Sequence, residues 1–509
     1  MLKKQLACFL LSICTCLLLS AQSPVPGSVV QTKDGITMYL DSNLSGGARV
    51  VRLQVVSDKI IRVTASATAR FPAVKSLIAV YPATVAGHTV EKKGDQVLLK
   101  TASLTASVQP ATGAVRFLDK SGTTLLAERR YNGRSFVPAV FEGQPSFGIT
   151  QTFETTPDDA YYGLGQHQAD QFNYKGQQVF LFQNNTEVGV PFLVSSKNYG
   201  ILWDNYSLTK IGDTRAFEQL SSLRLYDKNG GYGWLTASYS NDKTKPDDIA
   251  FTRAESVIDY PYLDDTKKGL PAAFKPQSGT LTWEGAIASD MEGMHKLMMT
   301  YGGAAKVWID GKLLVDRWRQ AWNPGSVVLN LDMQKGKKYP IKIFWSPDGS
   351  ESYISVKALT PVAAKDANAY SFSSEAGQQL DYYFVKGSNM DEVIAGYRTI
   401  TGKATMVPKW AMGFWQSRER YKTEEELLST VAEFRKRNIP LDNIVQDWSY
   451  WKENDWGSQE FDASRFGSPD SMIRELHNTY HTHFMISVWP KMYEGIAAYK
   501  DFDAKGLLY

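Results

Sequence analysis

The change of apolar pattern near Lys403 constrains the fold of this chain more than any other feature of its sequence. Before it, short segments alternate apolar and polar residues, which is typical of antiparallel β-strands. After it, strand-like segments alternate with helix-like ones: WAMGFWQS, KTEEELLSTVAEFRKRN, DNIVQDWSYW, SPDSMIRELHNTY and THFMISVWP. Repeated strand–helix units indicate a parallel sheet, so we expect a β-rich part followed by an α/β part.

Residues 403–509 are predicted to begin this α/β domain. Thr423 has a side chain suited to a helix N-cap, and Pro469 stands near the start of the next helix. About three strands precede Tyr509, whereas a (β/α)8 barrel needs about eight. The pattern fits a barrel or a doubly wound sheet, and in either case we expect the domain to be unfinished at Tyr509.

The β-rich part is predicted to contain two sandwiches, one inserted into the other. Strands in the first block, such as VVRLQVVSDKIIRVTAS, have the spacing of a β-sandwich or barrel. The second block holds KVWIDGKLLVDRW, where Asp310-Gly311 is predicted to form a tight hairpin turn. We therefore expect this order: a signal peptide at 1–21, an N-terminal β-sandwich at 22–231, an inserted β-sandwich at 232–362, the end of the first sandwich with a linker at 363–402, and the α/β domain at 403–509.

The first residues predict export. MLKKQLACFLLSICTCLLLSAQ has a basic start, a short apolar run and small residues for cleavage, as secretory signal peptides have. Cys8, Cys14 and Cys16 all lie in it, so the mature chain is expected to have no disulfide and no cysteine nucleophile. Lipid attachment is the alternative, but Ile13 and Thr15 stand where a small residue is wanted. We expect a periplasmic or cell-surface protein without a membrane span.

Charge and motif content argue against several classes of function. A formal net charge of +3 over 509 residues gives no basic field, so nucleic acid is not suggested as a partner. His477, His481 and His483 crowd one turn, and Asp264-Asp265 forms an acidic pair, but neither has the spacing of a defined metal site. GLGQHQADQF lacks the phosphate-binding pattern. We expect neither a metal nor another cofactor.

Carboxylate and indole side chains gather where the last strands end. Asp447-Trp448 ends one predicted strand, Trp489 ends the next, and six of the chain's thirteen tryptophans follow residue 403. Carboxyl ends of parallel strands meet at one edge of a sheet, indole faces suit the C–H faces of sugars, and a carboxylate accepts hydrogen bonds from hydroxyls. The hypothesis is a carbohydrate pocket. The alternative is that the tryptophans fill a core and that Asp447 caps a helix or pairs with Arg418 or Arg420.

At these residues the chain resembles glycoside hydrolase family 31, the retaining α-glycosidases. The resemblance covers nearly the whole mature chain and rests on several segments: YGLG at 162–165, VPF at 190–192, YGILWDN at 199–205, DYYF at 381–384, YR at 397–398, TG at 401–402, PKW at 408–410 and IVQDWSYW at 444–451. It implies a galactose mutarotase-like N-terminal β-sandwich and, from residue 403, the first part of a (β/α)8 TIM barrel.

Within that family IVQDWSYW is similar to the form in α-xylosidases, whereas α-glucosidases commonly have a second acid where Ser449 stands. The resemblance implies that Asp447 binds hydroxyls of the sugar in subsite −1 and that Trp489 walls this subsite. It also implies that Trp448 and Trp456 narrow the pocket against the hydroxymethyl group of glucose.

The inserted block, with TWEGAI, GGAAKVWIDGKLLVDRW and KYPIKIFW, resembles the protective-antigen 14-kDa β-sandwich carried by certain bacterial α-xylosidases. The resemblance implies that it lengthens the substrate cleft, and a spacing or stabilising module is the alternative.

The resemblance also implies that both catalytic aspartates stand on later barrel strands, beyond Tyr509. No catalytic residue is therefore expected in this chain, and as given it is expected to be inactive. The leading hypothesis is the N-terminal part of an α-xylosidase that releases α-linked xylose from xyloglucan oligosaccharides. The alternatives are an α-glucosidase or α-galactosidase of the same family and a non-catalytic carbohydrate-binding protein.

Overall fold

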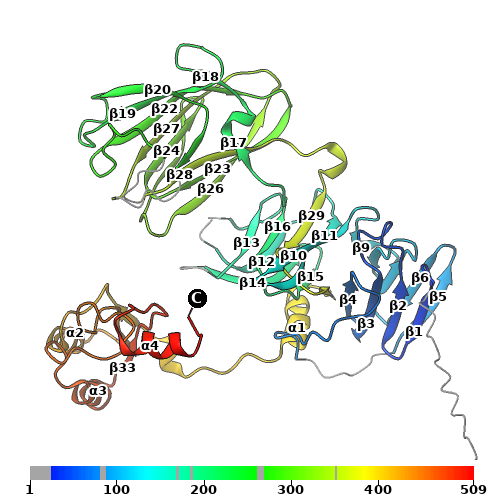
Figure 1. Ribbon diagram of the computed structural model, residues 1–509. Helices are drawn as coiled ribbons and strands as arrows, with labels where there is room; N and C mark the ends of the chain where they lie inside the picture. The colour runs from blue at the N-terminus through cyan, green and yellow to red at the C-terminus, as the bar shows by residue number, and fades with distance from the viewer. Residues whose placement is uncertain are drawn as a thin grey trace, which may run out of the picture. The chain divides into compact units, whose positions relative to one another are not determined.

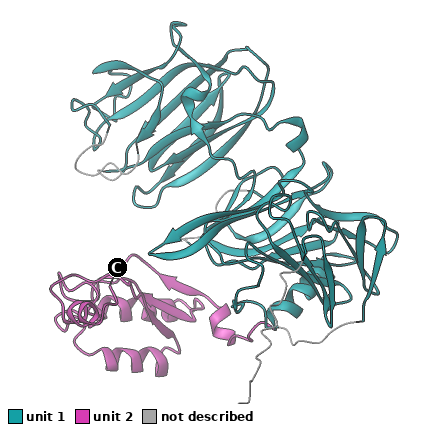
Figure 2. Ribbon diagram, turned by 45° about the vertical axis from the view of Figure 1, so that its right-hand side comes forward, with its two compact units in different colours: residues 1–402 teal, residues 403–509 magenta. Residues whose placement is uncertain are grey.

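The structure is a computed structural model that describes residues 25–80, 87–167, 171–183, 187–260, 269–349 and 352–508. The chain divides into two compact units, Met1–Gly402 and Lys403–Tyr509, which have different colours in Figure 2. The predicted signal peptide and the pair Asp264-Asp265 lie outside the described residues. Within the described ranges, no helix has both the length and the apolar character needed to cross a bilayer.

The first sandwich is built from two large antiparallel sheets in the first unit (Figure 1). One sheet has the order β1 (Val29–Thr32), β2 (Gly35–Tyr39), β3 (Val50–Ser57), β4 (Ile60–Ser66), β30 (Leu380–Lys386), β15 (Tyr199–Trp203), β14 (Val188–Ser195) and β12 (Tyr161–Gln166). The other has the order β13 (Val179–Leu181), β16 (Thr209–Gly212), β29 (Ala369–Ser374), β11 (Gln144–Glu154), β9 (Thr124–Glu128), β8 (Val115–Leu118), β7 (Thr105–Val108), β6 (Gln96–Lys100) and β5 (Thr89–Lys93), with β10 (Arg134–Phe141) paired to β11.

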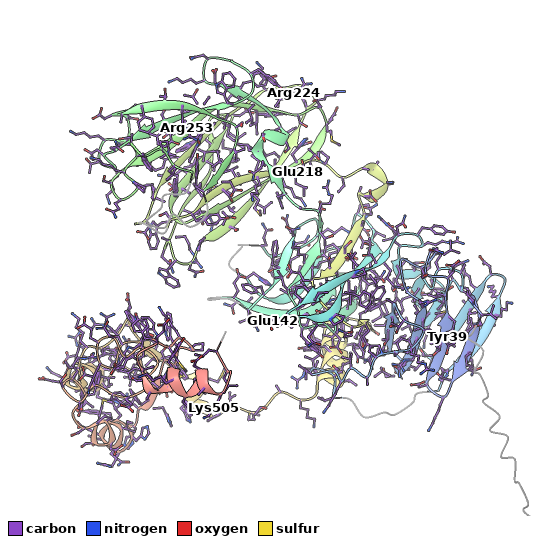
Figure 3. The ribbon with its side chains drawn as sticks, viewed as in Figure 1. Tyr39, Glu142, Glu218, Arg224, Arg253 and Lys505 are labelled. Carbon is purple, nitrogen blue, oxygen red and sulfur yellow. The ribbon has the colours of Figure 1, made fainter. Side chains whose placement is uncertain are left out.

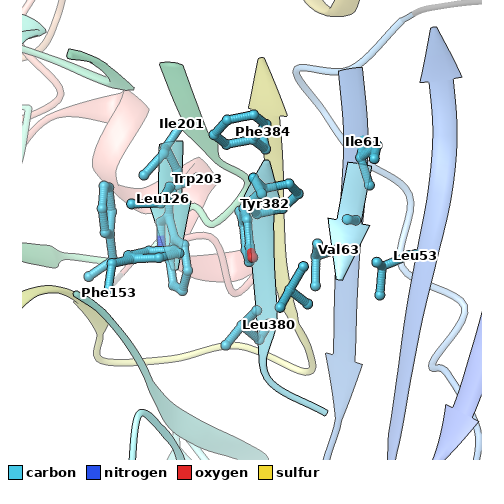
Figure 4. Close-up of a cluster of buried hydrophobic side chains, with 14 of the residues drawn as sticks. Leu53, Ile61, Val63, Leu126, Phe153, Ile201, Trp203, Leu380, Tyr382 and Phe384 are labelled. Carbon is cyan, nitrogen blue, oxygen red and sulfur yellow. The ribbon is translucent and has the colours of Figure 1, made fainter. Parts of the chain in front are cut away.

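Aliphatic and aromatic side chains from both sheets form the core of this sandwich, as the close-up in Figure 4 shows. Phe117 stacks on Phe384 with ring centroids 4.0 Å apart, and Phe153 meets Tyr382 edge to face at 5.4 Å. Trp203 is buried, and its indole N–H donates to the Ser374 hydroxyl at 2.8 Å. The core therefore joins strands that precede the inserted sandwich to strands that follow it, and helix α1 (Met390–Thr401) ends the unit.

The inserted sandwich has a smaller and a larger sheet, and Glu218, Arg224 and Arg253 mark it in Figure 3. The smaller sheet contains β17 (Glu218–Gln219), β28 (Ile354–Leu359), β23 (Gly293–Tyr301) and β26 (Gly325–Met333) in this order, with β21 (Ile258–Tyr260) paired to β28. The larger contains β20 (Phe251–Glu255), β19 (Leu235–Ser240), β22 (Thr280–Ala288), β27 (Tyr339–Ser346), β24 (Gly303–Ile309) and β25 (Lys312–Arg319), with β18 (Arg224–Asp227) paired to β22. Short 3-10 helices lie at Leu220–Ser222 and Ala364–Asp366.

The predicted hairpin of the insert is confirmed. Asp310 and Gly311 connect β24 to β25 and have φ angles of 50° and 74°. Two positive φ angles in succession are what a tight turn of the right twist requires between antiparallel strands.

The second unit has the predicted alternation of strands and helices. Three parallel strands, β31 (Trp415–Ser417), β32 (Asn443–Gln446) and β33 (His483–Ile486), pair in this order. The helices are α2 (Glu424–Lys436), α3 (Pro469–Asn478) and α4 (Ala497–Ala504), with a 3-10 helix at Lys409–Met412. The Thr423 hydroxyl accepts a hydrogen bond from the Glu426 N–H at 3.1 Å, so the predicted N-cap is confirmed. Leu427 and Val431 of α2 and Met472 and Leu476 of α3 pack with Ile444 in one buried cluster.

A buried ion pair joins the neighbouring strands β4 and β30 within one sheet of the first sandwich. The Arg62 guanidinium donates to both carboxylate oxygens of Asp381, with 2.8 Å from Nε to Oδ1, and Gln379 donates to the same carboxylate at 3.0 Å. Only 3% of the Asp381 side chain is exposed. Burial raises the pKa of Asp381 from 3.8 to about 6, because hydrogen bonds from Arg62 offset only part of the cost of desolvation.

Replacing one partner of this pair should destabilise the first sandwich strongly. Arg62→Met leaves the Asp381 carboxylate buried without its cation, and we expect a loss of about 3–5 kcal/mol in the free energy of unfolding. The loss should be smaller at about pH 5 than at about pH 8. A carboxyl whose folded pKa is raised favours the folded state more as the pH falls through that pKa. Chemical unfolding followed by circular dichroism measures both.

The double variant Arg62→Met/Asp381→Leu is the control, because it removes both charges and should recover most of the stability. A single variant that unfolds like the parent would contradict the role given to the pair.

Candidate functional site

The predicted site residues lie beyond the carboxyl ends of neighbouring parallel strands. Asp447 directly follows β32, and Trp489 stands three residues after the end of β33. Gln446 and Ile486 are register partners, and the Ser487 N–H donates to the Gln446 carbonyl at 3.0 Å. The two strands therefore end at the same level, and the segments that follow them leave from the same edge of the sheet.

Three of the predicted indoles form one cluster centred on Trp456. The ring centroids of Trp448 and Trp456 are 5.1 Å apart with an interplanar angle of 26°, and Trp489 meets Trp456 at 5.1 Å and 70°. Trp451 and Tyr493 extend the cluster at 5.5 and 6.0 Å from Trp456. Trp448 and Trp456 are partly buried, whereas 41% of Trp489 is exposed. The cluster thus offers one accessible indole backed by a packed aromatic wall.

A buried donor points to unused hydrogen-bonding capacity in this wall. The indole N–H of Trp456 is buried and finds no acceptor in the described part of the chain. Buried donors are normally paired, so this nitrogen is suited to a water molecule or a ligand oxygen.

The Asp447 carboxylate is partly buried and has no hydrogen-bond or ion-pair partner among the residues that the structure describes. The partners considered from the sequence are engaged elsewhere. Arg418 donates to Glu426 at 2.7 Å, and the Arg420 guanidinium lies 4.3 Å from the centroid of the Trp448 ring. The N-cap of α3 is Ser468, so Asp447 does not cap the next helix. This carboxylate is therefore available to accept hydrogen bonds from a ligand.

Cations lie over the same indoles. Besides Arg420 on Trp448, the Lys491 ammonium group is 4.4 Å from the centroid of Trp456. The site combines an acceptor, cationic donors and flat apolar rings, which are groups suited to recognise a polyhydroxylated ligand.

Arg465, which the sequence analysis did not single out, holds the segment after β32 in place. Its guanidinium donates to the carbonyl groups of Lys422, Ser449 and Trp451 at 3.1, 2.8 and 2.5 Å. It also donates to Asp462, and hydrogen bonds from Ser464 and then Arg465 lower the pKa of Asp462 to about 2. Ser449 has a φ of 63°, a left-handed conformation that a non-glycine residue adopts only when its surroundings fix it.

Two further hydrogen bonds, both through Gln459, connect this segment to the segment that carries Trp489. The Tyr450 hydroxyl donates to Gln459 at 2.6 Å, and the Gln459 side-chain N–H donates to the Trp489 carbonyl at 3.4 Å. No local sequence pattern marks Gln459 or Arg465, because their partners lie in other segments of the chain.

Trp410 and Trp415, whose role the sequence left open, lie near the amino ends of the parallel strands, opposite to the ends that Asp447 and Trp489 follow. Trp415 begins β31 and is the register partner of Asn443, which in turn is the partner of His483. Trp410 stacks on His483 with centroids 3.8 Å apart. Both indoles are thus at the amino ends of the strands and do not belong to the Asp447 cluster. Within the described ranges, no group of three or more histidine, cysteine or acidic residues is arranged to hold a metal ion.

Comparison with known families agrees with this architecture. Residues 50–211 match the glycosyl hydrolase 31 N-terminal galactose mutarotase-like domain, residues 230–361 match the PA14 domain, and residues 404–509 match the glycosyl hydrolases family 31 TIM-barrel domain. The fold and these matches define a multidomain glycoside hydrolase chain. The chain belongs to glycoside hydrolase family 31, as the resemblance implied, and the predicted fold class is confirmed.

Individual relatives include α-xylosidases. A crystal structure of the α-xylosidase from Xanthomonas citri superposes with a TM-score of 0.85 at 45% identity, over 94% of this chain and 51% of that one. An α-xylosidase from Saccharolobus solfataricus is 26% identical over 428 residues, 82% of this chain and 37% of that protein. α-Glucosidase 2 from Bacillus thermoamyloliquefaciens is 37% identical over 107 residues, 21% of this chain and 13% of that protein. This chain therefore spans about half or less of each of these relatives.

Arg465 should contribute far more to the stability of the second unit than an exposed arginine does. Arg465→Ala leaves three backbone carbonyls without their donor, and we expect a loss of roughly 3 kcal/mol in the stability of the second unit. The near-ultraviolet circular dichroism of the indole cluster should weaken as well. Thermal unfolding and the dichroism spectrum measure the two effects.

Arg437→Ala is the matched control. Arg437 pairs with Glu433 on the surface of α2 and is 66% exposed, so its loss should cost less than about 0.5 kcal/mol. Equal effects of the two substitutions would show that Arg465 does not organise the segment.

Proposed function

We propose that this chain is the sugar-recognising part of a retaining α-xylosidase that releases α-linked xylose from xyloglucan oligosaccharides. The observation that carries the proposal is the Asp447 carboxylate, which has no partner among the described residues and stands on the segment that also supplies the Trp448 and Trp456 indoles. Support for the sugar comes from the 45% identity with the Xanthomonas citri α-xylosidase over nearly the whole chain.

Each predicted site residue has a physical role in this proposal. The Asp447 carboxylate accepts hydrogen bonds from vicinal hydroxyls of the sugar in subsite −1. The exposed face of Trp489 stacks against the C–H face of the same ring. Trp448 and Trp456 narrow the pocket where glucose would place its hydroxymethyl group. Exclusion of one such group by shape is worth about 1–3 kcal/mol, so some activity on glucosides is expected.

Asp447 is proposed as a binding residue and not as the nucleophile. Retaining hydrolysis needs two carboxyl groups about 5–5.5 Å apart, and the resemblance places both on barrel strands beyond Tyr509. Hydrolysis is therefore proposed for the longer protein, and the 509-residue chain is expected to bind xylose without cleaving glycosides. The basic and apolar start of the sequence supports export to the periplasm or the cell surface.

An α-glucosidase is the second candidate. The similarity of 107 residues to an α-glucosidase at 37% identity favours it. Ser449 argues for the α-xylosidase, because the resemblance places a second acid at this position in α-glucosidases.

Xylose binding by the chain itself tests the site. Asp447→Asn should weaken xylose binding by about tenfold or more, because a neutral amide accepts weaker hydrogen bonds than a carboxylate. Titration of the intrinsic tryptophan fluorescence and calorimetry measure the affinity. Asp470→Asn, which changes an exposed aspartate on α3, is the matched control and should bind like the parent. The site assignment is wrong if both variants bind equally.

The sugar and the chemistry are tested on the full-length product of the gene. The coding sequence is read past Tyr509 for strands that end in aspartate, and the product is assayed on aryl α-xyloside and aryl α-glucoside. Preference for the xyloside is expected. Preference for the glucoside would defeat the steric role of the indoles, and a stop codon directly after Tyr509 would favour the non-catalytic binding protein.

A further inference from the structure

A second cluster of aromatic and charged side chains lies on the inserted sandwich and contains none of the residues of the Asp447 site. A cavity of about 590 Å³ opens on the larger sheet and is lined by residues of β18, β22, β27 and β24. The lining residues used below, called the sheet-face groove, are Tyr226, Glu284, Trp308, Lys338 and Lys342. This volume is in the range of about 300–1,000 Å³ found for ligand sites in proteins.

Strand alternation turns these side chains outward. In β24, Val307 and Ile309 are buried in the core, so Trp308 between them points to the opposite face. In β27, Ile341 and Ile343 are buried in the same way, so Lys342 points outward.

The register sets three of these side chains in one row across the sheet. Glu284 is the partner of Lys342, and Lys342 is the partner of Trp308. Tyr226 stands in the next row, as the partner of Ala286. Neighbouring strands are about 4.8 Å apart, so the row presents an acid, a base and an indole side by side.

A glycine lets β18 close against β22 beside this row. Gly285 has a φ of 155°, and a Cβ on it would lie 2.0 Å from the Tyr226 carbonyl oxygen. Any other residue would therefore push Tyr226 away from the groove.

The charges of the groove are nearly balanced. Lys342 Nζ is 3.4 Å from Glu284 Oε1 and 5.7 Å from the centroid of Trp308, while Lys338 Nζ is 3.6 Å from the centroid of Tyr226. The Asp227 carboxylate accepts hydrogen bonds from the backbone N–H groups of Asn229 and Gly231 at 2.8 and 2.7 Å. An exposed lysine over a ring is held weakly and can move to a ligand hydroxyl. The groove thus has donors, an acceptor and two ring faces without a strong field of either sign.

We propose that the sheet-face groove is a second carbohydrate-binding site, which takes a neutral polysaccharide chain. Two aromatic faces stack on sugar rings, Glu284 accepts from hydroxyls, and the two lysines donate to hydroxyl and ring oxygens. A polyanion is disfavoured because Glu284 lies 3.4 Å from Lys342 and because Asp227 also lines the cavity. This site goes beyond the proposed α-xylosidase function: all of its residues lie in the insert, and only the choice of xyloglucan as its ligand rests on the proposed function.

Binding to soluble xyloglucan tests the proposal, with the 509-residue chain that carries Asp447→Asn as the parent, so that the other site is impaired. Affinity electrophoresis should show retardation of this parent. Trp308→Ala should weaken binding by about tenfold, the effect of losing one stacked ring. Glu284→Gln, a surface change that should leave the fold intact, should weaken binding several-fold. Circular dichroism confirms the fold of each variant.

Trp322→Ala is the matched control, because Trp322 also belongs to the insert, is 61% exposed and does not line the groove. It should bind xyloglucan like the parent.

The proposal is overturned if the parent does not bind xyloglucan, if it binds only the anionic polygalacturonate, or if Trp322→Ala weakens binding as much as Trp308→Ala. Failure of the Asp447 site shows instead as unchanged xylose affinity in Asp447→Asn, so the two failures are distinguishable.

Discussion

The parallel pairing of β32 with β31 on one side and β33 on the other determines where the residues of the Asp447 site can lie. Because the three strands run in one direction, the segments after them all begin at one edge. Asp447 and Trp489 are 42 positions apart in the sequence, yet both follow the end of a strand in this sheet. Arg465 and Gln459 then fix the path of the segment between them. Pairing brings the residues to one edge, and these two side chains order them there.

In the first unit, strand pairing likewise explains how the inserted sandwich is accommodated. β16, the last strand of the first sandwich before the insert, and β29, the next after it, are antiparallel neighbours, with Lys210 opposite Ser373. Both ends of the insert therefore leave from one end of an existing strand pair, as in an enlarged hairpin. A long insertion at such a place costs little in loop closure, since that cost grows only slowly with length. This explains how the sandwich core can be continuous from Phe153 to Tyr382 despite the insert.

The sequence predicted what depends on local pattern. The alternation of strand and helix correctly predicted Asp447 at a strand end. The pair Asp310-Gly311 correctly predicted the hairpin turn of the inserted sandwich. The sequence left the role of Trp415 open, because the exact start of a short strand is not marked in it. In the structure Trp415 begins β31, at the amino ends of the parallel strands, whereas Trp489 follows the end of β33. The position of Trp456 at the centre of the indole cluster depends on the path of a long loop. The sheet-face groove could not be predicted from the sequence either, because β22, β27 and β24 are neighbours in the sheet in an order that differs from their order in the chain.

A crystal structure of the chain soaked with xylose tests the central claim most directly. The account predicts a sugar ring whose vicinal hydroxyls lie within hydrogen-bond distance of the Asp447 carboxylate and whose flat face rests on Trp489. A structure in which these two side chains lie on opposite sides of the sheet, or in which xylose binds without touching either, would contradict it.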